Sequence, residues 1–112
     1  MPTPIPEPWR KAVVAILRKR TPGARIEIRQ RARQDWKDTF LAAFDYQLLE
    51  VLAKTLAQPV EGNQVFDMTP PGEIYEFFFY HESKRMFGKV GLHDTTLVIV
   101  FSAHTPLKGN QL

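Results

Sequence analysis

Four side chains that can move a proton or bind a phosphate occur in the second half of the chain: Tyr80, Arg85, Lys89 and His104. A histidine, or a tyrosine or lysine with a lowered pKa, can take the proton of a ribose 2′-hydroxyl or protonate a leaving 5′-oxygen. Arginine and lysine neutralise phosphate and can stabilise a pentacovalent transition state. Together these groups could cleave RNA without a metal ion. The alternative is that they only pack on a sheet with hydrogen-bonded tips, which is the more frequent role of such side chains.

These residues can converge because three apolar runs, rich in aromatic and β-branched residues, predict a three-stranded antiparallel meander. We expect its strands at Ile74–His81, Lys84–Leu92 and Leu97–His104. The first gap, Glu82-Ser83, fits a two-residue turn, and the second gap has four residues. Each strand then lies beside the next, and residues far apart in the sequence can share one face.

Pairing across the two turns sorts the side chains of the meander onto two faces, because side chains alternate along a strand. The expected opposite pairs are Tyr80–Arg85, Phe78–Phe87 and Glu76–Lys89 across the first turn, and Arg85–His104 and Phe87–Ser102 across the second. One face is expected to be mixed: Glu76, Phe78, Tyr80, Arg85, Phe87, Lys89, Val100, Ser102 and His104. The other is expected to be apolar and to pack under helices: Tyr75, Phe77, Phe79, Met86, Val90, Leu92, Leu97, Ile99 and Phe101.

The segment before the meander predicts further elements. Four prolines among residues 1–8 indicate an extended arm without regular structure. A helix with an apolar stripe is expected over residues 9–20, with Arg10, Lys11, Arg18 and Lys19 mostly on its polar side. Alternation then predicts a half-exposed strand over residues 25–30.

A pair of helices is expected next. The first covers residues 32–43 with Ala32, Trp36 and Phe40 on one stripe, and the second covers residues 46–57 with Asp45 as its N-cap. Residues 60–71 predict mostly loop, with one short strand possible at Val65-Phe66, and the tail after His104 is expected to be irregular. Helices laid on one face of a small, mostly antiparallel sheet make an α+β domain, here with an extra N-terminal helix.

Composition sets limits on function. The 112 residues are expected to form a single domain, with a net charge of +3. The charge is uneven: residues 1–37 hold ten Lys or Arg against three Asp or Glu, so this third carries +7 and the remainder −4. Such a bias suggests a polyanion or an acidic partner, although a basic helix face that is only solvated would give the same count.

Several classes of protein are not indicated. With no cysteine, the chain can form neither disulfides nor a cysteine metal site, and the three histidines lack close metal spacing. Nucleotide-binding glycine loops, the HExxH motif and a nucleophile elbow are absent. No apolar run approaches the roughly 20 residues of a membrane helix, and the N-terminus has no signal-peptide core. We therefore expect a cytoplasmic protein without metal, cofactor or membrane contact.

The order of a strand, two helices and the segments YEFFFYHESKRMFGKVGL and TLVIVFSAHTPLK resembles the RelE/HigB/ParE superfamily of bacterial type II toxins, over about Arg25 to Lys108. The matching positions are Tyr75-Glu76, Lys84-Arg85, Lys89, the run VIVFSAH and Lys108. Members usually carry an arginine in the strand after the Tyr-Glu pair and another in the next strand. Here those places hold Phe77-Phe78-Phe79 and Phe87-Gly88-Lys89.

The resemblance implies a small antiparallel sheet against a helical hairpin, and an mRNA-cleaving endoribonuclease that often acts on the ribosome without a metal and is neutralised by an antitoxin protein. It would make Arg85, Lys89 and His104 catalytic residues. The expected convergence of side chains across the strands adds Tyr80 to this catalytic group, as a residue that assists or stacks. Further nucleic-acid contacts are expected from Arg29, Arg31, Arg33, Lys84, Phe87 and Lys108. The N-terminal arm and helix, outside the common core, could contact an antitoxin or a second subunit of a homodimer.

Two other functions stay open. A ParE-like relative would share the fold but poison DNA gyrase and leave RNA intact. A non-catalytic accessory domain would use its basic residues only to bind nucleic acid or a protein. The role of Glu76 also stays open: it could be a catalytic carboxylate or only a cross-strand partner of Lys89.

Overall fold

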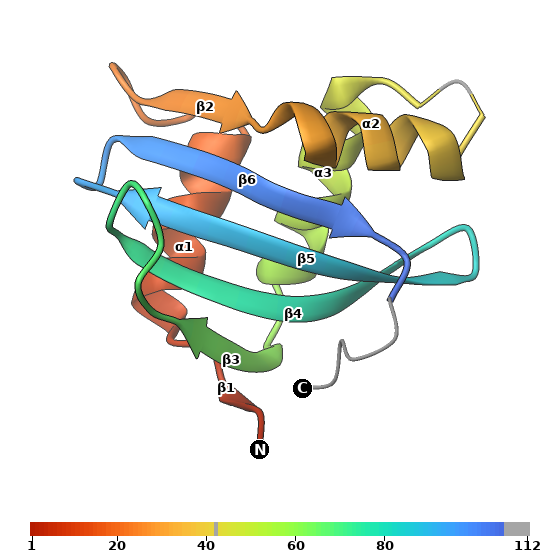
Figure 1. Cartoon of the computed structure of the whole chain (residues 1–112). Helices are drawn as coiled ribbons and strands as arrows, with labels where there is room; N and C mark the ends of the chain where they lie inside the picture. The colour runs from red at the N-terminus through yellow and green to blue at the C-terminus, as the bar shows by residue number, and fades with distance from the viewer. Residues whose placement is uncertain (42, 107–112) are drawn as a thin grey trace.

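Six strands form one sheet in the order β1-β3-β4-β5-β6-β2 (Figure 1). The structure is a computed structural model that describes residues 1–41 and 43–106. Within these ranges the strands are β1 (Thr3–Pro4), β2 (Arg25–Ile28), β3 (Glu61–Val65), β4 (Glu73–His81), β5 (Lys84–His93) and β6 (Leu97–His104), and the helices are α1 (Glu7–Leu17), α2 (Gln30–Thr39) and α3 (Asp45–Leu56). Neighbouring strands are antiparallel except β2, which runs parallel to β6. The α+β class expected from the sequence is confirmed.

The hairpin of β4 and β5 has the expected register. Tyr80 pairs with Arg85, and Phe78–Phe87 and Glu76–Lys89 follow along the ladder. The turn residues Glu82 and Ser83 both have positive φ, 49° and 66°. Positive φ at both central positions is typical of the type I′ turn, whose twist matches that of the flanking strands.

The register of β5 against β6 differs from the expected one. His93 pairs with Leu97, so the loop has three residues, Asp94, Thr95 and Thr96, instead of the predicted four. Asp94 and Thr95 have positive φ, 51° and 58°. Further along, Val90 pairs with Val100 but Lys89 pairs with Ser102, which leaves Phe101 as the extra residue of a β-bulge. The predicted pairs Arg85–His104 and Phe87–Ser102 are therefore wrong, and the observed pair is Phe87–His104.

The shorter loop reverses the faces of β6, and the bulge then restores them. Val98, Val100 and Ala103 belong to the core, so the assignment of Val100 to the mixed face was wrong. Leu97, Ile99 and Phe101 lie on the opposite face from the one predicted, because they alternate with the two valines. After the bulge, Ser102 and His104 return to the face on which the sequence placed them. The extra residue at the bulge in β6 thus compensates for the missing residue in the loop between β5 and β6.

The core lies between one face of the sheet and the helices, and Figure 1 shows α1 and α3 crossing behind that face. The predicted stripe of Ala32, Trp36 and Phe40 is buried. The largest fully buried side chains of this core are Trp36, Phe77, Phe79, Leu48, Leu52, Leu56 and Met86. We call the opposite side of strands β4, β5 and β6 the outer face.

The start of α3 differs from the prediction that Asp45 is its N-cap. Phe44 precedes the helix, and its backbone N–H donates to the side-chain oxygen of Gln47 at 3.1 Å. Asp45 is the first helical residue and accepts from Nε of Arg33 at 3.0 and 3.1 Å. The carboxylate still sits in the first turn, where the helix dipole favours negative charge, but Arg33 holds it away from the capping geometry.

Two segments predicted as irregular form strands. In the proline-rich arm, Thr3 and Pro4 pair with Gly62 and Glu61, and Ile5 is buried. Proline is compatible with an edge strand because the missing N–H can face away from the ladder. The predicted loop over residues 60–71 contains β3, which includes Val65 but leaves Phe66 outside and exposed.

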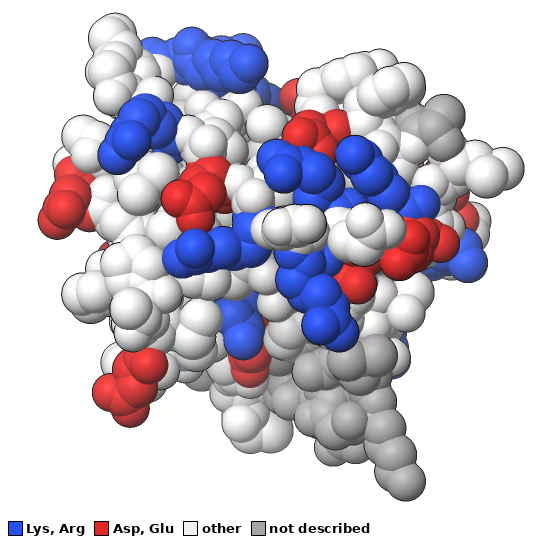
Figure 2. Space-filling model, turned by 45° about the horizontal axis from the view of Figure 1, so that its top comes forward, with Lys and Arg blue, Asp and Glu red and all other residues white. Residues whose placement is uncertain are grey.

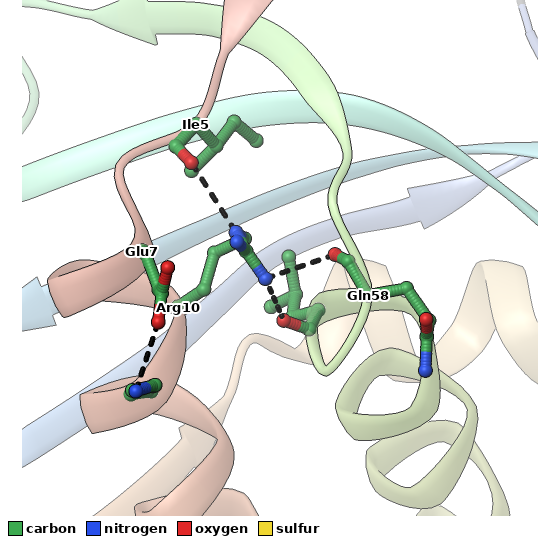
Figure 3. Close-up of polar contacts among 6 residues, drawn as sticks. Ile5, Glu7, Arg10 and Gln58 are labelled. Carbon is green, nitrogen blue, oxygen red and sulfur yellow. Dashed lines mark hydrogen bonds and ion pairs between the residues drawn. The ribbon is translucent and has the colours of Figure 1, made fainter.

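Arg10, which the sequence placed with the residues of the polar side of the first helix, is buried instead. Its side chain is only 8% exposed, and Figure 3 shows it between the arm and the end of α3. Nε donates to the carbonyl of Ile5 at 3.2 Å, and Nη1 donates to the carbonyls of Leu56 and Gln58, each at 3.0 Å. The last carbonyls of a helix lack intrahelical donors and carry partial negative charge, so Arg10 both caps α3 and fixes the arm.

We expect Arg10→Met to lower the free energy of unfolding by roughly 2–3 kcal/mol. Methionine keeps most of the apolar stem but leaves three carbonyls without their charged donor. Urea denaturation measures the effect. Lys11→Met is the control, because Lys11 is exposed and Glu7, at 2.8 Å, is its only ion-pair partner in the described part of the chain. A change below about 0.5 kcal/mol is expected there. Equal stabilities of the two variants would contradict the capping role.

Candidate nucleic-acid site

The outer face carries all four residues predicted to act on RNA. Tyr80 and Arg85 are a cross-strand pair, Lys89 lies opposite Ser102, and His104 lies opposite Phe87. Strand alternation places them on the same side of the sheet. The site therefore assembles from β4, β5 and β6, although with a different partner for His104 than the sequence predicted.

His104 is held by two contacts. Its ring stacks on Phe87 with centroids 5.2 Å apart and an interplanar angle of 24°. Its Nδ1 lies 2.7 Å from the carbonyl oxygen of Thr105. A carbonyl oxygen only accepts, so Nδ1 carries the hydrogen, and in the neutral ring Nε2 has a free lone pair. His104 is thus oriented as a proton acceptor.

Two cations flank the histidine along β5. Arg85 and Lys89 each stand two residues from Phe87, which corresponds to about 7 Å along the strand on either side of His104. The guanidinium of Arg85 lies over the ring of Phe78, 4.6 Å from its centroid. Within the described residues neither cation forms an ion pair, and Glu76 faces Lys89 without one. Both positive charges are therefore available to an anionic ligand.

The aromatic residues of the outer face differ in access. Tyr80 is 67% exposed, whereas Phe87 is only 4% exposed and contacts the rings of Phe78 and His104. A base could stack on Tyr80 but has little access to Phe87. The expected contact from Phe87 to nucleic acid is thus replaced by a supporting role under His104.

The other predicted nucleic-acid contacts lie elsewhere. Arg29, Arg31 and Arg33 belong to the junction of β2 and α2, and each pairs with an acid: Glu27 at 3.0 Å, Asp35 at 3.6 Å and Asp45 at 3.0 Å. Lys84 is exposed at the start of β5, next to the turn. Lys108 lies outside the described residues. The structure therefore does not bring Arg31 or Arg33 into the group around His104, whereas the guanidinium of Arg29 reaches β6 and lies over the ring of Phe101, 5.4 Å from its centroid.

The remaining histidines have structural positions. His81 packs against Trp36 and Phe40, with ring centroids 5.2 and 4.8 Å away. His93, which the sequence places in an exposed loop, ends β5 and is 4% exposed. Its Nδ1 lies 2.8 Å from the carbonyl of Pro71. The missed signal is the two glycines that lie against this ring, since a Cβ on Gly72 or Gly91 would overlap His93.

Tyr75 and Glu76, which match the Tyr-Glu pair of the toxin family, point to opposite faces of β4. Tyr75 points to the core, where its ring lies 4.9 Å from that of Trp9 and its hydroxyl donates to Glu73 at 2.8 Å. Burial and this hydrogen bond raise the pKa of Tyr75 to about 12, so the phenol stays protonated near neutral pH. Tyr75 therefore has a structural position, and Glu76 alone faces the site.

Among the described residues, no cluster of three or more His, Asp or Glu side chains has the geometry to bind a metal ion. No helix in the same part of the chain has the length and hydropathy of a transmembrane span. The chain matches no protein-family model, no curated protein and no solved structure.

Proposed function

We propose that the protein is a metal-independent endoribonuclease of the type II toxin kind that cleaves RNA on the outer face of its sheet. The observation that supports this proposal best is the geometry of His104. Among the described residues, its Nδ1 contacts a backbone carbonyl, its Nε2 has no hydrogen-bond partner, and Arg85 and Lys89 flank it without ion-pair partners. This set supplies a proton acceptor and phosphate-binding charges on one accessible surface.

In this proposal the reaction is an internal transesterification. Nε2 of His104 takes the proton of a ribose 2′-hydroxyl, whose oxygen attacks the adjacent phosphorus. The bond from phosphorus to the 5′-oxygen breaks, and that oxygen takes a proton from Tyr80 or from water. Arg85 and Lys89 stabilise the additional negative charge of the transition state. The products are a 2′,3′-cyclic phosphate and a 5′-hydroxyl end.

The resemblance to RelE/HigB/ParE toxins supports mRNA, free or on the ribosome, as the substrate, and an antitoxin as the protein that restrains the activity. It also supports growth inhibition as the consequence of expression. The two usual arginines that this chain lacks would then be replaced in function by Arg85 and Lys89, which occupy neighbouring positions of the same sheet.

The test is cleavage of labelled RNA by the purified protein in the presence of EDTA. We expect cyclic-phosphate products and no cleavage when the nucleotide before the scissile bond is 2′-deoxy, because the attacking hydroxyl is then missing. Induced expression in bacteria should arrest growth and fragment transcripts. Arrest with intact RNA would favour a gyrase poison, and salt-sensitive RNA binding without cleavage or arrest would favour an accessory domain. Either outcome would overturn the proposal.

A further inference from the structure

The open edge of β2 is a second candidate surface. β2 is the last strand of the sheet, and Figure 1 shows it along the upper margin. On the β6 side, the N–H groups of Arg25 and Arg29 donate to the carbonyls of Thr96 and Val100 at 2.8 and 3.0 Å. Since the direction of the main-chain groups alternates in a parallel pair, those of Ile26 and Ile28 point away from β6. No described group outside the sheet pairs with them, so they form a template for another strand.

A groove of about 440 Å³ borders this edge. Its apolar lining comes from α1, β2 and α3, and most of these side chains are half-buried: Ile16, Ala24, Ile26, Ile28 and Leu49. Lys19, Thr21, Arg33 and Asp45 complete the lining with polar groups. A strand added beside β2 would direct every second side chain towards the groove. The site therefore fits an extended segment with alternating apolar residues.

The charge around the edge favours an acidic occupant. Figure 2 shows lysine and arginine gathered on the face that carries β2 and α2, with acids between them. Arg29 and Arg33 are neutralised by Glu27 and Asp45. Lys19 and Arg25 form no ion pair within the described part of the chain, which leaves an excess of positive charge beside the groove.

Two other occupants suit the site less well. A second copy of this chain, paired antiparallel about Ile26 and Ile28, would place Glu27 of both copies opposite each other and would bring the excess cations together. A nucleic acid would meet the outward carbonyl oxygens of Ile26 and Ile28, which repel phosphate. The nearby ring of Phe101 is covered by the guanidinium of Arg29, 5.4 Å from its centroid, and offers no free stacking surface.

We propose that the edge of β2 binds an extended acidic segment of a partner protein as an additional strand, in which apolar residues alternate with Asp or Glu. The apolar side chains enter the groove, and the carboxylates, on the opposite side of the added strand, face Arg25. Lys19 adds positive charge in the lining of the groove. Main-chain hydrogen bonds to Ile26 and Ile28 provide the attachment. The site is distinct from the outer face and does not depend on RNA cleavage.

The test uses a synthetic peptide, acetylated and amidated Glu-Val-Glu-Ile-Glu-Val-Glu, added to the full chain at low salt and followed by NMR and amide hydrogen exchange. We expect the amides of Ile26 and Ile28 to exchange at least tenfold more slowly with peptide, while those of Arg25 and Arg29, already bonded in the sheet, change little. Two further peptides carry N-methyl groups at every second amide, one peptide for each of the two alternating sets of amides. Only one of these peptides keeps the N–H donors that face β2. Strand addition therefore predicts that this peptide binds and the other does not, whereas simple charge attraction predicts equal binding.

Charge-reversal variants test the electrostatic contribution to peptide binding. Lys19→Glu combined with Arg25→Glu should weaken peptide binding by about tenfold at low salt, while Lys54→Glu with Lys84→Glu, which change the same charge on α3 and β5, should not. His104→Phe should leave peptide binding unchanged, so a failure of the peptide-binding proposal can be told apart from a failure of the ribonuclease proposal. Unaltered exchange at Ile26 and Ile28 at millimolar peptide would overturn the inference. Equal binding of a lysine-substituted peptide, or stronger protection by single-stranded RNA, would overturn it as well.

Discussion

His104→Phe is expected to reduce the rate of RNA cleavage by about 100- to 10,000-fold, the usual contribution of a positioned general base. Phenylalanine can keep the stacking contact with Phe87, whose centroid lies 5.2 Å from that of the His104 ring. It removes both ring nitrogens, and with them the free Nε2 and the contact from Nδ1 to the carbonyl of Thr105. The substitution therefore separates proton transfer from packing. The measurement is single-turnover cleavage of an RNA oligonucleotide in EDTA.

Stability and binding provide the controls for this prediction. Thermal unfolding of His104→Phe should stay close to that of the parent chain, because the half-buried ring is replaced by one of similar size. RNA binding should fall far less than cleavage, since Arg85 and Lys89 remain. Lys89→Ala should weaken binding as well as cleavage, and the exposed Lys11→Ala on α1 should change neither. Full activity of His104→Phe with intact folding would contradict the role of His104 and leave it as a packing residue.

How far the sequence predicts the fold depends on local turn chemistry. The β4–β5 hairpin has the predicted register because the gap at Glu82-Ser83 admits only a short turn. The β5–β6 register was missed because Asp94 and Thr95 reach positive φ without glycine, and because nothing in the run LVIVFSAH marks Phe101 as a bulge. Turns formed by residues other than glycine have weak sequence signals.

Local turn chemistry also decided how much of the candidate site was predictable. The errors in its prediction follow from the register of β5 against β6. Tyr80, Arg85 and Lys89 depend on the first hairpin only, so their common face was correct. His104 reached the right face through two compensating errors, and its pairing with Phe87 was not foreseen. The buried position of Arg10 could not be predicted, because its partners are backbone carbonyls at residues 5, 56 and 58, which carry no side-chain signal.

Among the glycines that the structure describes, Gly62 is the one where an added Cβ would come closest to another atom. It lies in β3 between Thr3 of β1 and Phe77 of β4. A Cβ at this position would stand 2.2 Å from the backbone oxygen of Glu76 and 3.0 Å from Cδ1 of Ile5. The first of these atoms belongs to the backbone of a central strand and cannot turn aside as a flexible side chain can. The sequence context, Gly62-Asn63, predicts a loop and gives no sign of this close approach.

Gly62→Ala should therefore lower the free energy of unfolding by roughly 3 kcal/mol or more, which corresponds to a decrease in Tm of about 13 °C for a domain of this size. Gly23→Ala is the matched control: Gly23 has φ of 77° but nothing within 4 Å of its Cβ position, so only backbone strain of about 1 kcal/mol is expected. Urea and thermal unfolding measure both. Hydrogen exchange at the Ile5 amide, which donates to the carbonyl of Val60 at 2.9 Å, should accelerate in Gly62→Ala alone, because displacement of β3 also releases the arm. A loss no larger than that of Gly23→Ala would mean that β3 and β4 are farther apart than the structure places them.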